Sequence, residues 1–75
     1  MQGGAGEEVG LLLREPSTRV RALAARLAGK LDLAGLRPDL QVLCHDPDAD
    51  VRNAAEWALA MPLLVWLDQR ARLAS

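Results

Sequence analysis

The sequence predicts an all-α protein made of two helical hairpins and a C-terminal helix. Leu and Ala are the commonest residues and are strong helix formers, whereas Phe and Tyr are absent. The β-branched residues are few and scattered, so no segment has the pattern of a strand. Apolar residues recur at helical spacing, and prolines separate the segments in which they do so. A chain of 75 residues is enough for a single domain.

The first predicted hairpin spans about residues 7–31. It follows a Gly-rich tail, residues 1–6, which we expect to be flexible. The first helix of the hairpin begins with two acidic residues, whose charge the helix dipole favours at that end. Val9, Leu12 and Leu13 have the spacing of one apolar face, and we expect all three to be buried.

The second helix of this hairpin, residues 18–31, has a clear start signal and two stripes of side chains. Pro16 ends the preceding helix, and Ser17 is suited to cap the next one. We expect the apolar stripe to be buried; it consists of Val20, Leu23, Ala24, Leu27 and Leu31. The stripe beside it is basic and consists of Arg19, Arg26 and Lys30.

The second predicted hairpin spans about residues 37–61. Pro38 suits the first turn of its first helix, which ends at Asp46-Pro47, and Asp48 is suited to cap its second helix. The face of that second helix that we expect to be buried consists of Val51, Ala54, Ala55, Ala58 and Leu59. We predict that a terminal helix, residues 62–74, begins at Pro62.

The second hairpin repeats the first at a constant interval along the chain. Pro16 matches Pro47, Val20 matches Val51, and the arginine after each valine matches as well. Self-similarity at a fixed interval of this size is typical of solenoids, in which each hairpin buries its apolar face against the next. The sequence therefore predicts a short α-α superhelix.

The motif D-P-D-x-D-V-R-x-x-A-x-x-x-L, residues 46–59, resembles a HEAT repeat, and REPSTRVRALAARLA, residues 14–28, resembles the same motif. The short interval is most similar to the bacterial subclass named for phycobilin lyases. The resemblance implies that each proline marks the bend of a hairpin. It also implies that the motif arginine pairs with an acidic turn residue of the neighbouring repeat, either Arg52 with Glu15 or Arg21 with Asp46.

The sequence predicts no catalytic residue, cofactor or metal site. Cys44 and His45 adjoin Asp46, but the chain has no second Cys or His with which to build a common zinc site. The alternating acids Asp46, Asp48 and Asp50 lack the Gly and late Glu of an EF-hand loop. The chain shows no secretory signal, and its longest apolar run is too short to span a bilayer, so we predict a cytoplasmic, non-enzymatic protein.

The predicted function is protein–protein interaction through the terminal helix, by self-association as a homodimer or by docking on a larger partner. Residues 63–67 are consecutively apolar, so they point all the way round a helix, and a second molecule would cover the exposed side. The candidate partner-binding residues are Leu64, Val65, Trp66, Trp57 and Met61. For Trp57 and Met61, the favoured expectation is that they pack under the terminal helix, which then acts as a cap, and a role as partner-binding anchors is the alternative.

Two other classes of function stay open at this stage. Arg19, Arg26 and Lys30 are possible phosphate contacts of a nucleic-acid-binding repeat protein, although a net charge of −1 makes nucleic acid the less favoured partner. Such binding would weaken steeply with salt, whereas an apolar interface would not. The resemblance to the lyase-named repeats also allows a chromophore lyase, for which two repeats offer little concave surface.

Overall fold

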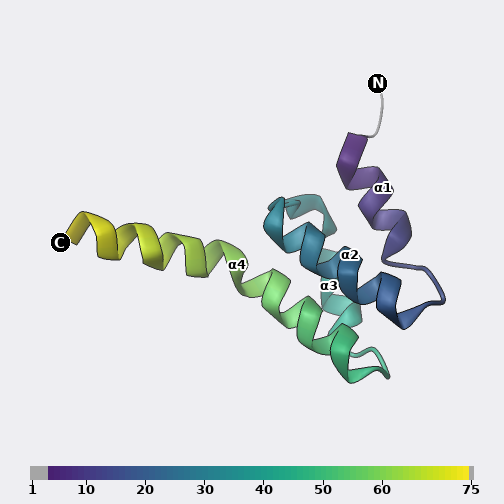
Figure 1. The fold of residues 1–75 in the computed structure, drawn as a ribbon. Helices are drawn as coiled ribbons and strands as arrows, with labels where there is room; N and C mark the ends of the chain where they lie inside the picture. The colour runs from purple at the N-terminus through teal and green to yellow at the C-terminus, as the bar shows by residue number, and fades with distance from the viewer. Residues whose placement is uncertain (1–3, 75) are drawn as a thin grey trace.

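The structure is a computed structural model that describes residues 4–74, with side chains over residues 6–63 and 67–73. Its helices pack as two consecutive hairpins, and the described residues contain no strand (Figure 1). In chain order, the elements are α1 (Gly4–Leu12), α2 (Thr18–Lys30), the short 3₁₀ helix η1 (Ala34–Leu36), α3 (Arg37–Leu43) and α4 (Ala49–Ala74). The predicted all-α fold is confirmed.

The helix α1 begins at Gly4, ahead of the predicted start at residue 7. Val9 and Leu13 are buried, as predicted, and they pack against α2. Leu12, in contrast, is 41% exposed and does not belong to the core. Gly10 also lies close to another element, because a Cβ there would stand 3.3 Å from the side chain of Leu36.

The buried face of α2 differs from the predicted one. Leu23, Leu27 and Leu31 are 57%, 40% and 48% exposed, so the prediction of a buried leucine stripe was wrong. The face that is buried carries small residues, namely Ala22, Ala24, Ala25, Ala28 and Gly29. The reason is geometric, since small side chains allow the backbones of two helices to approach closely and bury each other fully.

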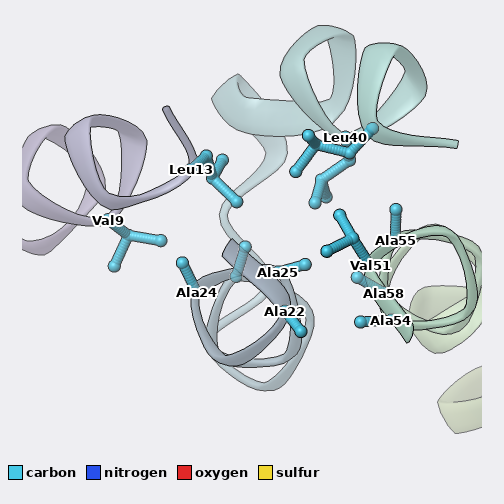
Figure 2. Packing of buried hydrophobic residues seen from close by; sticks show 12 residues of the cluster. Val9, Leu13, Ala22, Ala24, Ala25, Leu40, Val51, Ala54, Ala55 and Ala58 are labelled. Atoms are coloured by element: carbon cyan, nitrogen blue, oxygen red, sulfur yellow. The ribbon is translucent and has the colours of Figure 1, made fainter. Parts of the chain in front are cut away.

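The core lies where α2 and α4 face each other, with α1 packed against α2 and α3 packed against α4 (Figure 2). Val51 is fully buried. Among the described side chains with less than 2% exposure, it is the largest. Figure 2 shows it between Leu40 of α3 and Ala25 of α2. The predicted face of the second hairpin is confirmed: Ala54, Ala55 and Ala58 are buried, and Leu59 packs at the edge of the core.

The two hairpin turns are held by equivalent arginines. Arg21 donates from Nη1 to the carbonyl oxygens of Glu15 and Pro16, both at 2.8 Å. Arg52 donates in the same way to the carbonyl oxygens of Asp46 and Pro47, at 2.7 and 2.9 Å. Each arginine therefore satisfies the carbonyl groups that its own turn leaves without helical partners.

Arg21 additionally joins the first repeat to the second. Its Nε lies 3.0 Å from Oδ2 of Asp46, and both side chains are largely shielded from solvent. Of the two pairings that the resemblance implied, the structure shows the one between Arg21 and Asp46. The same carboxylate accepts from the backbone N–H of Asp48 at 2.9 Å. The hydrogen bond from Asp48 and the ion pair with Arg21 lower the pKa of Asp46 below its usual value.

The helix caps also follow the repeat. The Ser17 hydroxyl accepts from the backbone N–H of Val20, and the Asp48 carboxylate accepts from that of Val51, three residues further on in both cases. Both predicted caps are thus confirmed.

Helix α4 continues through Pro62, so the predicted boundary between a fourth and a fifth helix is absent. Proline inside a helix removes one backbone hydrogen bond, and its ring crowds the carbonyl four residues earlier, here that of Ala58. Figure 1 accordingly shows α4 changing direction about half-way along its length. We call residues 49–61 the packed half of α4 and residues 62–74 the C-terminal arm.

Candidate functional site

The helices α2 and α4 approach each other closely at Gly29. A Cβ on this glycine would lie 2.8 Å from Cα of Ala58, closer than real Cβ atoms stand, and a tight 3.1 Å from the ring of Trp57. Among the residue types, only glycine therefore fits at this crossing without moving the two helices apart. The contact determines how the side chains that flank it on both helices are placed relative to each other.

Two adjoining hollows flank this crossing on one side. The first has a volume of about 430 Å³ and is lined by Arg26, Lys30, Asn53, Ala54 and Trp57. The second has a volume of about 340 Å³ and is lined by Gly29, Lys30, Asp32, Met61 and Pro62. Lys30 lines both hollows, and we call the two together the α2–α4 groove. It ends at Pro62, where the C-terminal arm begins.

The groove brings together residues from two of the sequence-predicted sets. Arg26 and Lys30 come from the basic stripe of α2, and Trp57 and Met61 come from the predicted partner-binding set on α4. Arg19, the third member of the basic stripe, is exposed and does not line the groove.

Trp57 and Met61 are not covered by a terminal helix, so that prediction was wrong. The C-terminal arm extends α4 in place of folding back over it, and Trp57 stays 37% exposed at the groove while Met61 is half-buried. The ring of Trp57 packs at Gly29 through its Cζ3 atom, and the same residue lines the first hollow of the groove.

The C-terminal arm projects away from the other helices (Figure 1). Each of its described side chains, residues 62–63 and 67–73, is exposed to solvent. Leu63 and Leu67 are 59% and 49% exposed, and they stand one helical turn apart, which places them on one face. The side chains of Leu64, Val65 and Trp66, three predicted partner-binding residues, lie outside the described residues.

Cys44, His45 and the acidic residues that follow them, which were considered for metal binding or nucleophilic chemistry, are placed as ordinary parts of the fold. Cys44 is half-buried, and burial raises the pKa of its thiol, with a smaller contribution from the negative charge of Glu56. His45 is exposed at the end of α3, and the Asp46 and Asp48 carboxylates hold the turn. Within the described part of the chain, no three acidic, His or Cys side chains are placed to hold a metal ion.

Comparison with known proteins agrees with this architecture. The family model for HEAT repeats matches residues 8–72, which is most of the chain. The chain belongs to the HEAT-repeat family. HEAT repeats generally mediate protein–protein interaction and are typically non-enzymatic. No curated protein and no solved structure matches the chain. Within the described residues, none of the helices of this HEAT-repeat protein combines the length and apolar character that a membrane span requires.

Sequence reasoning missed Gly29, Asn53 and the small-residue face of α2. A signal for this face was present, because Ala25 and Gly29 on α2 and Ala54 and Ala58 on α4 are small residues spaced by four. That spacing places both pairs in rows along one side of a helix, where two backbones can come together. The spacing of the leucines was equally helical, so periodicity alone favoured the larger residues.

Proposed function

We propose that this HEAT-repeat chain is a non-enzymatic protein-interaction module that docks through its C-terminal arm, either on a second copy of itself or on a larger partner. The observation that supports this proposal is the exposure of every described side chain of the arm, including Leu63 and Leu67 on one face. A helix that carries leucines in water gains free energy when another surface covers them, roughly 1.5–3 kcal/mol for each fully buried leucine.

The free energy gained by burying these leucines indicates a weak to moderate association. Two arms crossing at this face would bury four leucines, two from each copy, and part of the gain offsets the lost translational and rotational freedom. We therefore expect self-association with a dissociation constant in about the micromolar range. An interface of this kind is apolar, so raised salt should not dissociate the dimer.

Sedimentation equilibrium over a wide concentration range, at low and high salt, tests the proposal. We expect a dimer at high concentration in both salts, and a shift to monomer in the Leu67→Glu variant. Val42→Glu is the matched control, because Val42 is 69% exposed on α3 and lies outside the arm. An unchanged dimer in Leu67→Glu would contradict a role for the arm. A folded monomer at every concentration would contradict self-association and leave a larger partner, whose capture Leu67→Glu should abolish and Val42→Glu should not.

A further inference from the structure

The α2–α4 groove carries two cationic side chains that the fold does not use. Arg26 and Lys30 stand one turn apart on α2, both are exposed, and both line the first hollow of the groove. Among the described residues, neither makes an ion pair or a side-chain hydrogen bond. The arginines at the turns differ in this respect, because Arg21 and Arg52 donate hydrogen bonds to backbone carbonyl oxygens.

No acidic side chain of the described residues lies beside these cations in the first hollow. The segment that forms α2 contains no acidic residue, and none of the described residues that line the hollow carries a carboxylate. Asp32 lines only the second hollow, where it stands near Lys30. The first hollow is therefore a net positive site, and it sits on a protein whose overall charge is slightly negative. A ligand that is drawn to this hollow by charge is therefore an anion.

The other walls of the first hollow add an apolar surface and polar donors. Trp57, which is 37% exposed, and buried Ala54 supply the apolar part of its lining. Asn53 lies one turn before Trp57 on α4, and its amide offers two N–H donors. Arg26 can hold a carboxylate with two parallel N–H donors, while a neighbouring apolar side chain contacts the indole.

We propose that the α2–α4 groove binds an acidic peptide segment of a partner protein, with Arg26 and Lys30 pairing with its carboxylates and Trp57 contacting an adjacent apolar side chain. The alternative anion, a single-stranded nucleic acid, also combines base stacking on an aromatic ring with phosphate contacts. The groove favours the peptide, since Arg19 does not line it and two cations neutralise only two phosphates, a weak attraction for a strand whose phosphates extend beyond the groove.

This binding site is separate from the leucines of the C-terminal arm, so it goes beyond the proposed docking through the arm. The separation makes the two proposals independently testable. Arg26→Glu with Lys30→Glu should remove peptide binding and leave self-association intact. Leu67→Glu should do the opposite.

The experiment is a selection from a random peptide library on the immobilised full chain, followed by fluorescence anisotropy with the enriched peptides and with a labelled oligothymidylate. The test variant is the Arg26→Glu/Lys30→Glu double substitution. The matched control is Arg14→Glu/Arg19→Glu, which changes the net charge equally at two exposed positions outside the groove. Circular dichroism confirms that both variants are folded.

We expect enriched peptides that place Asp or Glu beside Leu, Val or Phe. Their affinity should fall about tenfold or more in the groove variant, a difference of about 1.4 kcal/mol, and stay within about twofold in the control. Enrichment without acidic residues, or equal affinity in the two double variants, would overturn the proposal. Tighter binding of oligothymidylate than of every enriched peptide would also overturn it, in favour of nucleic acid.

Discussion

Residues 49–61 and 62–74 form one continuous helix, and both halves are rich in apolar residues, yet they have opposite surroundings. In the packed half, Val51, Ala54, Ala55 and Ala58 have almost no exposure. In the C-terminal arm, every described side chain is exposed. The difference lies in what the neighbouring helix offers. The small residues of α2 match the small residues of the packed half, and no second element of residues 4–74 lies beside the arm (Figure 1).

The comparison teaches that apolar content does not by itself determine burial in this protein. The exposed Leu23 and Leu27 of α2 lead to the same conclusion, because they are larger and more apolar than the buried alanines beside them. Close approach of two backbones requires small side chains, and the leucines are then left outside the contact. The following predictions test this difference between the two halves.

The largest effect should come from truncating the core of the packed half. Val51→Ala removes two methyl groups from a fully buried position and leaves a cavity, so we expect a loss of about 2–3 kcal/mol in the free energy of unfolding. Leu67→Ala is the matched change in the arm and should alter that free energy by less than about 0.5 kcal/mol. Urea unfolding at a concentration where the chain is monomeric measures both. Equal losses would show that the arm contributes to the core.

A smaller loss should follow from widening the helix crossing. In Gly29→Ala, the new Cβ meets backbone and ring atoms that must move apart, which typically costs about 1–3 kcal/mol. The better helix propensity of alanine offsets up to about 1 kcal/mol of this.

Gly6→Ala is the control for this crossing, because no atom lies within 4 Å of a Cβ at that position. It should be neutral or stabilising in thermal unfolding, since it gains only the helix propensity. If Gly29→Ala behaved in the same way, the two helices would not be in contact at Gly29.

The smallest effect should appear in the pH dependence of stability. The pKa of Asp46 is lowered in the folded state, so its stabilising contribution is complete above the unfolded value of about 3.9 and is lost as the pH falls through the lower folded value. The difference in melting temperature between wild type and Asp46→Asn should therefore be largest near neutral pH and shrink below about pH 4.

Asp68→Asn provides the matched control in the arm. Its carboxylate pairs with Arg72 at 3.2 Å, but both side chains are largely exposed, and such pairs contribute little. The melting temperature of this variant should follow that of the wild type at every pH. A pH-independent difference for Asp46→Asn would instead indicate that the charge of Asp46 has no role in the turn.

The sequence predicted the local features of the fold well because local chemistry determines them. Ser17 and Asp48 are capping residues in equivalent turns, and the pairing of Arg21 with Asp46 followed from the repeat resemblance. The buried face of α2 and the boundary at Pro62 were predicted wrongly. The first depends on how closely two distant segments approach, and the second on whether a neighbouring element makes the chain turn back, and neither is encoded within one helix.

In the candidate site, too, the individual residues could be predicted from the sequence, but their arrangement in space could not. Trp57, Met61, Arg26 and Lys30 were singled out from sequence, but only the crossing of α2 and α4 places them in one groove. Asn53 had no distinguishing signal, because a lone Asn on an exposed helix face is ordinary.

The position of Pro62 has a further consequence for the cooperativity of the helix. Because its nitrogen carries no hydrogen, the bond that would join the two halves at this residue is missing. Helical order then passes less readily from the anchored half into the arm, and an isolated helix of the length of the arm is only marginally stable in water. The arm should therefore lose its helical structure at lower temperature than the core. A partner that holds it must supply part of the ordering free energy, so its affinity is coupled to the helix–coil equilibrium of the arm.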